Sequence, residues 1–362
     1  MKINFVIFST KLTGGTRVVM EVINGLSDLG HEVNLITFGK PEDLDWIDLK
    51  AKVHYANRSF SEKVSGFIYR KIFGFQPFPE EQTRKLIKTM PEADVSIATI
   101  SYSGLAVARS DKGTPFHFYM HYEPFVREPG YLKKIIEESY YLPTKKIVNS
   151  SWLAEKIKTE TGQDIVGLVF PAIDHSIFYP RKKKDKLGKE IRIVALAKYK
   201  RWKGVPEALE TIKILRERGY KIRFSTFGTK FDKSMLPENV RNVEFDFVGR
   251  KANEDLAEFY SDADLLISSS YFESFPLPQL EAMACGIPVV TTRYGTEDYA
   301  VDGENCFVVE PHQPEKMADR VAEIIDNPNL YNKFSEAGIE TASKFKWKKS
   351  VKQMEEILLK EK

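Results

Sequence analysis

The sequence predicts an α/β protein built from two doubly wound parallel sheets. Apolar segments of strand length alternate with amphipathic segments of helix length from end to end, which is typical of parallel sheets with right-handed crossovers. A charged stretch, residues 181–190 (RKKKDKLGKE), interrupts the alternation, which then starts again. The chain of 362 residues is long for one hydrophobic core and sufficient for two.

The first half begins with a predicted buried strand (INFVIFS) and a helix from about Thr16 to Leu29, which Gly30 ends. Apolar residues of this helix fall at helical spacing and give it one apolar face. A second strand follows (HEVNLITF), and three later runs (ADVSIATI, TPFHFYMH and KKIVNSS) predict strands buried on both faces.

The second half repeats this pattern with a strand (IRIVALAK), a helix (VPEALETIKILRERG) and further strands (KIRFSTFG, VEFDFVG, ADLLISSS, IPVVTT and CFVV). We therefore expect two Rossmann-like domains, over residues 1–172 and 173–344, followed by an amphipathic helix over residues 345–362. Ligands of such folds bind outside the carboxyl ends of the strands, so the expected site is a central cleft that both domains face.

Composition excludes several classes of protein. A hydrophobic content of 42% with 29% charged residues describes a globular protein, and a net charge of +3 leaves no general basic footprint for nucleic acid. No apolar run approaches the ~20 residues of a membrane span, and the first run is too short for a signal peptide. Cys285 and Cys306 lack metal-ligand spacing and fit a reducing compartment, so we expect a cytoplasmic protein.

The strongest functional pattern is YFESFPLPQLEAMACGIPVV, residues 271–290. Glu273 lies in a loop after a predicted strand, and Glu281 lies in a short helix that Gly286 ends. The N-terminus of that helix favours a phosphate, and the two carboxylates would suit hydroxyl groups, as in a sugar nucleotide. The alternative is that Glu273 is a solvated loop charge and Glu281 an ordinary helical glutamate.

This stretch resembles retaining glycosyltransferase family 4 (glycosyl transferases group 1) of the GT-B superfamily. The shared pattern is two glutamates separated by seven residues, a helix of small residues, then Gly, Pro and Val-Val; it matches Glu273, Phe275, Glu281, Ala282, Gly286, Pro288 and Val289. The resemblance implies that Glu273 contacts the donor sugar and Glu281 the ribose hydroxyls, while the backbone of Ser274, Phe275 and Leu277 faces the diphosphate. Pro276 stands where the family usually has Gly, and proline has no N–H, so one phosphate donor is missing or is supplied by Leu277.

A basic loop, KYKRWKG, follows the first strand of the second half. Family members have Arg and then Lys-Gly here, which reach the diphosphate, so the resemblance assigns Lys198, or Arg201 in its place, and Lys203 to that role. Without the resemblance, the loop would be interpreted as a solvated run of cations. Gly249 and Arg250 end a strand where the family holds the nucleobase through backbone groups.

In the first half, Gly14 and Gly15 end the first strand and precede Thr16. A full dinucleotide-binding fingerprint is absent there, which disfavours a dehydrogenase. The resemblance implies that Gly15 faces the donor phosphate and that Gly14 and Thr16 lie on the acceptor side; the alternative, a tight strand-to-helix turn, explains one glycine well and two less well. His121 ends another predicted strand, where the family places a histidine near the donor sugar. The run HYEPF that begins at His121 also resembles a subset of the family that transfers rhamnose.

Metal chemistry is not expected. Asp262 and Asp264 flank Ala263 on the way into an apolar strand, so they fit a helix-to-strand turn better than a sugar-nucleotide metal site. We expect no cofactor, with the sugar nucleotide as co-substrate and the leaving diphosphate neutralised by a helix dipole and by cations.

The resemblance therefore implies a retaining, metal-independent hexosyltransferase that uses a nucleoside-diphosphate sugar, with Glu273, His121 and Lys203 as its catalytic residues. The acceptor would be a glycan, a lipid-linked glycan or a lipid, in cell-surface polysaccharide or glycoconjugate synthesis. The last helix would cross back to the N-terminal domain. Residues 63–84 mix aromatic and basic side chains, which suits peripheral contact with the inner membrane face or a helix that covers the sheet. The alternatives are a GT-B epimerase or phosphorylase, or a non-catalytic nucleotide-sugar-binding module.

Overall fold

The computed structural model describes residues 1–56, 64, 67–68, 71–72, 80–126, 130–182 and 187–362. The chain forms two compact units, which we describe separately. Unit 1 comprises Met1–Pro171 and Trp347–Lys362, and unit 2 comprises Ala172–Lys346.

Unit 1 contains a seven-stranded sheet in the order β3-β2-β1-β4-β5-β6-β7, in which each described pairing is parallel. The strands are β1 (Lys2–Ile7), β2 (Glu32–Thr37), β3 (Lys52–Tyr55), β4 (Val95–Ala98), β5 (Thr114–Tyr119), β6 (Lys145–Val148) and β7 (Ile165–Leu168). The central strands are buried on both faces, which explains their continuous apolar runs.

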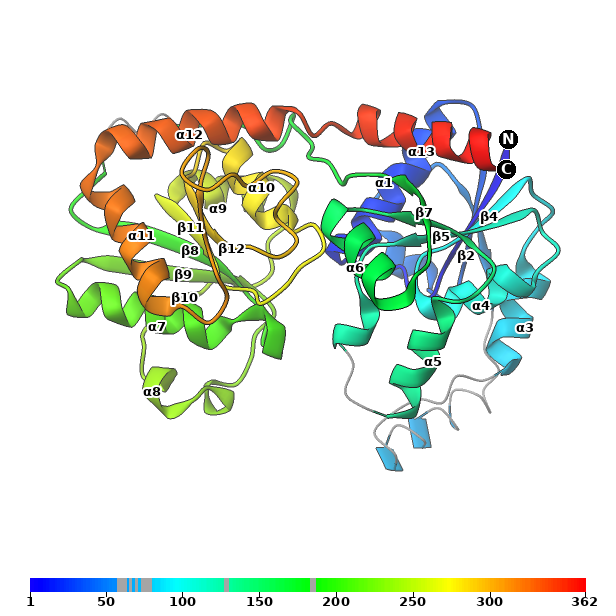
Figure 1. Ribbon diagram of the computed structural model, residues 1–362, viewed down its shortest axis with the longest axis horizontal. Helices are drawn as coiled ribbons and strands as arrows, with labels where there is room; N and C mark the ends of the chain where they lie inside the picture. Colours follow the sequence, from blue (N-terminus) through cyan, green and yellow to red (C-terminus); the bar gives the residue numbers. More distant parts are fainter. Residues whose placement is uncertain (57–63, 65–66, 69–70, 73–79, 127–129, 183–186) are drawn as a thin grey trace. The chain divides into compact units, whose positions relative to one another are not determined.

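The helical segments of unit 1 with both ends described are α1 (Gly14–Asp28), η1 (Pro41–Leu44), α3 (Glu80–Thr89), α4 (Ser101–Arg109), η2 (Glu123–Val126), α5 (Tyr131–Ser139), α6 (Ser151–Thr161) and α13 (Trp347–Glu361). Helix α1 begins two residues earlier than expected because the Thr13 side chain caps it, accepting a hydrogen bond of 3.1 Å from the N–H of Thr16. Helix α13, from the far end of the chain, packs beside α1 (Figure 1).

Unit 2 contains a six-stranded parallel sheet in the order β10-β9-β8-β11-β12-β13. The strands are β8 (Ile191–Ala197), β9 (Ile222–Gly228), β10 (Asp246–Phe247), β11 (Leu265–Ser268), β12 (Val289–Thr292) and β13 (Phe307–Val309). The helical segments are η3 (Arg201–Lys203), α7 (Val205–Glu217), η4 (Lys233–Met235), α8 (Glu238–Arg241), α9 (Asn253–Asp262), α10 (Leu277–Ala284), α11 (Pro314–Asp326) and α12 (Pro328–Ser343).

In both units the first strand lies inside the sheet and the strand order reverses beside it, which is the topology of a doubly wound sheet. The predicted pair of parallel α/β sheets is therefore confirmed. The core of unit 1 includes completely buried side chains such as Phe5, Ile97 and Phe118.

The stretch 63–84, interpreted above as a surface for membrane contact, falls largely outside the described residues; its last part begins α3 at Glu80. Among the helices of the described part, none combines the length and the apolar character that a bilayer span requires.

Candidate functional site

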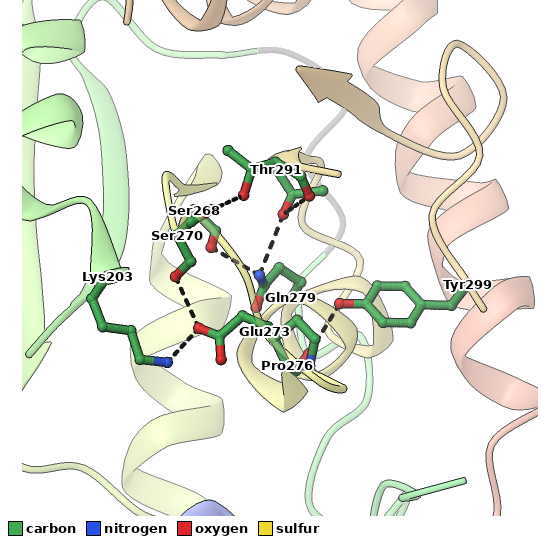
Figure 2. A network of polar contacts seen from close by, with 9 residues as sticks. Lys203, Ser268, Ser270, Glu273, Pro276, Gln279, Thr291 and Tyr299 are labelled. Atoms are coloured by element: carbon green, nitrogen blue, oxygen red, sulfur yellow. Dashed lines mark hydrogen bonds and ion pairs between the residues drawn. The ribbon is translucent and has the colours of Figure 1, made fainter. Parts of the chain in front are cut away.

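The carboxyl end of the sheet in unit 2 carries a charged pair, Lys203 and Glu273. Lys203 ends the short turn η3 after β8, and Glu273 lies in the loop between β11 and α10. Lys203 donates to Glu273 Oε1, and the Ser270 hydroxyl donates to the same oxygen at 2.9 Å (Figure 2). The side chains of Lys203 and Glu273 are only 15% and 14% exposed. The structure thus brings two of the three predicted catalytic residues into direct contact.

The turn that carries Lys203 and the loop that carries Glu273 are fastened together by backbone contacts. The N–H of Tyr271 donates to the carbonyl of Trp202 at 2.7 Å, and the Ser269 hydroxyl donates to the carbonyl of Gly204 at 2.6 Å. Gly204 has a φ of +59°, and a Cβ there would overlap with the carbonyl oxygen of Ser269. Glycine is therefore required at this position by both conformation and space.

The N-terminus of α10 lies at the end of the same loop. Pro276 is its N-cap and Pro278 follows Leu277, so two of the N–H groups that a helix usually offers there are missing. The N–H groups of Leu277 and Gln279 remain near the positive end of the helix dipole. The sequence analysis noted the departure at Pro276 but not the second proline.

Side-chain hydrogen bonds fix α10 against the sheet (Figure 2). The amide of Gln279 donates to the hydroxyls of Ser268 at 2.8 Å and of Thr291 at 3.3 Å, and so ties the helix to β11 and β12. The Tyr299 hydroxyl donates to the carbonyl of Pro276 at 3.0 Å. The helix N-terminus is thereby held at a defined place beside Glu273.

Further cations surround the pair. Partial burial lowers the pKa of Lys198, and the positive charges of Lys203, Lys200 and Arg250 lower it further, while the charge of Glu273 opposes them. These groups are therefore close enough to interact. Lys198 and Arg250 keep exposed side chains, so solvent moderates the repulsion. A group of cations that repel one another beside a helix N-terminus is suited to a multiply charged anion.

Three predicted donor-binding residues point into the fold of unit 2. Ser274 is 3% exposed, and the ring of Phe275 packs against Tyr299 and Phe345 with centroid separations of 5.3 and 5.5 Å. Glu281 is 5% exposed and accepts a hydrogen bond of 3.3 Å from the Tyr260 hydroxyl. Ser274 and Phe275 can therefore offer a ligand chiefly their backbone.

Arg201 begins the turn η3 that Lys203 ends, and Gly249 lies on another loop of the same edge. Arg201 is exposed, and its positive charge acts to lower the pKa of the Tyr271 hydroxyl. Gly249 has a φ of +81°, and its carbonyl accepts a hydrogen bond of 2.9 Å from the N–H of Gly228. The loop that begins at Gly249 is thus fastened to the end of β9.

The remaining predicted residues belong to unit 1. Gly14 and Gly15 form the first turn of α1, and the Thr16 hydroxyl lies 2.8 Å from that of Thr13. The expectation that His121 ends a strand is wrong. Strand β5 ends at Tyr119, its last residue paired with β6, and the chain then turns toward η2, so His121 lies in the turn. Its carbonyl accepts a hydrogen bond of 3.4 Å from the Tyr140 hydroxyl.

Within the described residues, no group of three or more His, Cys, Asp and Glu side chains is arranged to hold a metal ion. Asp262 ends α9 and pairs with Lys182 at 2.5 Å, and Asp264 accepts a hydrogen bond of 2.7 Å from the N–H of Arg192. Asp262 and Asp264 thus lie at the junction of α9 and β11, where the sequence predicts a helix-to-strand turn.

Comparison with solved structures identifies the class of fold. Sucrose-phosphate synthase from Thermosynechococcus elongatus superposes with a TM-score of 0.77 and 17% identity, over 99% of this chain and 98% of that chain. The Anabaena protein HepE, solved in complex with UDP and glucose, superposes with a TM-score of 0.76 and 16% identity, over 99% of this chain and 100% of that chain. The protein has the GT-B fold.

The sequence of unit 2 is similar to that of a known family. Residues 179–341 match the family described as glycosyl transferases group 1. The D-inositol 3-phosphate glycosyltransferase of Corynebacterium efficiens is 27% identical over 214 residues, which are 54% of this chain and 50% of the relative. The chain spans about half the length of the curated relatives it matches.

Proposed function

We propose that the protein is a retaining, metal-independent glycosyltransferase that moves a sugar from a nucleoside-diphosphate sugar to a hydroxyl group of an acceptor. One observation carries this proposal: Lys203 and Glu273 are in contact beside the N-terminus of α10, with Lys198 and Arg250 close by. The match of residues 179–341 to the glycosyl transferases group 1 family supports it.

The roles of the residues in unit 2 follow from their charges. Lys203, Lys198 or Arg201, and the N–H groups at the start of α10 would stabilise the charge that develops on the departing diphosphate. Glu273 would accept hydrogen bonds from the donor sugar, and Glu281 from the ribose. The loop at Gly249 and Arg250 would hold the nucleobase.

The roles in unit 1 rest on family resemblance. The first turn of α1 would approach the donor phosphate with Gly15 and the acceptor with Gly14 and Thr16, and His121 would orient the sugar. No side chain of this set is an evident covalent nucleophile. We therefore propose that the acceptor hydroxyl attacks on the face from which the diphosphate leaves and passes its proton to a donor phosphate oxygen.

The identity of the substrates is also part of the proposal. HepE was solved with UDP and glucose, so UDP-sugars are the first donors to test. The acceptor is proposed to be a glycan, a lipid-linked glycan or a lipid in cell-surface polysaccharide or glycoconjugate synthesis at the inner membrane face. The HYEPF run beginning at His121 makes nucleotide-linked rhamnose a second donor to include.

The test is a thermal-shift screen against nucleoside diphosphates and their sugars, followed by product analysis with an acceptor panel. A cognate donor at a hundredfold excess over its Kd should add ~2.7 kcal/mol to the free energy of unfolding. Formation of a glycosylated acceptor with retained anomeric configuration supports the proposal. Stabilisation without transfer to any acceptor, or isomerisation of the donor sugar alone, would contradict it.

A further inference from the structure

Three side chains beside the proposed site have no role in it so far: Tyr271, Glu207 and His312. They come from the loop that carries Glu273, from the first turn of α7, and from the segment between β13 and α11. We propose that these three residues form a polar brace that fixes the Glu273 loop relative to Lys203, and that they are positioning residues for sugar transfer. The inference rests on the proposed function.

The contacts of the brace converge on one carboxylate oxygen. The Tyr271 hydroxyl donates to Glu207 Oε1 at 2.5 Å, and His312 Nδ1 lies 3.4 Å from the same oxygen. The rings of Tyr271 and His312 also contact each other, with centroids 3.8 Å apart and planes inclined by 42°. One residue of the Glu273 loop is thus held by two elements that are remote in the sequence.

The position of Tyr271 explains why this contact would matter for the charged pair. Its backbone N–H donates to Trp202, the neighbour of Lys203, and Glu273 lies two residues further along the loop. The ring of Phe272 stacks on that of Trp202, with centroids 6.1 Å apart. A displacement of Tyr271 would therefore change the separation of Lys203 and Glu273 directly.

A small cavity lies beside the brace. Ser269, Thr292, Glu207 and His312 line part of a cavity of about 10 Å³, which is close to the smallest space that accommodates one water. Glu207 Oε2 is buried and has no hydrogen-bond partner among the described residues. Burial of this oxygen without a hydrogen bond is unfavourable. The other oxygen, Oε1, accepts the hydrogen bond from Tyr271.

The backbone of His312 points to the same conclusion. Its φ is +62°, in the left-handed region that most residues with a Cβ avoid. Such conformations persist only where the surrounding structure determines them, and they are concentrated at functional sites. Here the conformation places the imidazole over the Tyr271 ring.

Tyr271 is suited to act as a permanent donor. Burial, the hydrogen bond to Glu207 and the charge of Glu207 all raise the pKa of its hydroxyl, and only the charge of Arg201 opposes them among the main influences. The hydroxyl therefore keeps its proton at any pH at which the protein would work. Glutamine at position 207 would still accept this hydrogen bond, whereas alanine would not.

The test compares Y271F, E207A, E207Q and the double variant Y271F/E207A in steady-state sugar transfer, with the donor found by the thermal-shift screen. We expect kcat to fall roughly tenfold in Y271F and in E207A, with the donor KM changed less than about threefold, because the loop is displaced while the binding groups remain. E207Q should restore most of kcat. The double variant should be no slower than the slower single variant, since both remove one contact.

Y220F is the matched control. The Tyr220 hydroxyl also donates to a carboxylate at 2.5 Å, that of Asp326, but on an exposed surface of unit 2. Its kcat should equal that of the wild type. H312G, which keeps the backbone conformation accessible, should lower kcat in the same direction as Y271F.

The outcomes distinguish failure of the brace from failure of the proposed function. If the wild type and Y220F transfer sugar and Y271F is equally fast, the brace is refuted and the proposed function stands. Additive losses in the double variant, or a loss of kcat in E207Q equal to that in E207A, also refute it. If the wild type transfers no sugar from any donor in the screen, the proposed function fails and the brace fails with it.

Discussion

The carboxyl edges of the two sheets share an architecture and differ in how glycine is used. In unit 2, a Cβ at Gly204 would overlap with the Ser269 backbone, so packing alone requires the glycine. In unit 1, a Cβ at Gly14 would meet nothing within 4 Å, and one at Gly15 would meet only the Met120 side chain, at 3.8 Å. Packing therefore does not require glycine at positions 14 and 15, whereas close approach of a ligand, as proposed above, would.

The units also differ in how they bury polar groups. Unit 2 buries the carboxylate of Glu273 against Lys203 and Ser270, so this charge is paired at the proposed site. Unit 1 completely buries His117, and neither of its ring nitrogens has a hydrogen-bond partner among the described residues. A buried charge at the proposed site of unit 2 has partners, whereas a positive charge on the buried His117 of unit 1 would lack them among the described residues.

The largest expected effect concerns the charged pair in unit 2. K203A should lower kcat/KM by about a hundredfold or more, because the enzyme would lose ~3–4 kcal/mol of stabilisation of the departing diphosphate. Steady-state kinetics with the cognate donor would measure this, and circular dichroism would establish that the variant is folded. K221A, at the exposed lysine that precedes β9, is the control and should remain within about twofold of the wild type. Near-normal turnover of K203A would remove the diphosphate role.

The contrast between the glycines gives the next prediction, in stability. G204A should lower the free energy of unfolding by ~2–4 kcal/mol, because the new methyl group overlaps with Ser269 and the backbone is left-handed there. G14A should change it by less than about 1 kcal/mol, and in the stabilising direction, since alanine favours the helix. Denaturant unfolding would measure both. G14A should nevertheless reduce turnover. If G14A turns over as fast as the wild type, Gly14 has no role beyond beginning α1.

Much of the fold could be predicted because most strands are buried on both faces and are therefore visible as apolar runs. Strands β3 (KVHY) and β7 (IVGL) were not identified, since both lie at the ends of the sheet and are only half-buried. The length of β5 was overestimated for a related reason: Met120 continues the apolar run after pairing has ended at Tyr119.

The candidate site could be predicted only in part. Residue spacing locates the loop at Glu273 and the helix at Glu281, but the partners of Glu273 and the roles of Lys198 and Lys203 came from family resemblance. Glu207, Tyr271 and His312 were missed because they are far apart in the sequence and meet only in the folded unit. The one local signal was the run Ser268-Ser269-Ser270 at the end of β11, whose hydroxyls all make hydrogen bonds at this edge.

Acid should affect unit 1 through His117. Burial and the neighbouring charge of Lys146 lower the pKa of His117 to about 3 in the folded protein. The unfolded chain binds a proton at this histidine below about pH 6.5, so the free energy of unfolding should fall as the pH drops from about 6.5 towards 3. At pH 5 the loss is ~2 kcal/mol relative to neutral pH. H117F keeps an aromatic ring against Tyr119 and should flatten this dependence by about one proton.

Denaturant unfolding of the wild type and of H117F at pH 7, 6 and 5 would measure the pH dependence of their free energies of unfolding. Tyr119, Gly104 and Lys146 face His117 from β5, α4 and β6, and Lys146 donates to two backbone carbonyls, so it has no reason to change its charge over this range. Parallel stability profiles for H117F and the wild type would mean that protonation of His117 is accommodated by the fold.

The smallest expected effect concerns Glu281, which separates a binding role from a packing role within unit 2. As a ligand for ribose hydroxyls, Glu281 should contribute one charge-assisted hydrogen bond, so E281A should weaken nucleoside-diphosphate binding roughly tenfold. Calorimetric titration would measure this, with E258A, on the exposed side of α9, as the control.

The alternative is that Glu281 acts only through its buried hydrogen bond to Tyr260. In that case E281A and Y260F should lose stability equally and keep the affinity of the wild type. A loss of affinity in E281A that Y260F does not share would instead mean that this carboxylate, although 5% exposed, reaches the ligand through that remaining surface.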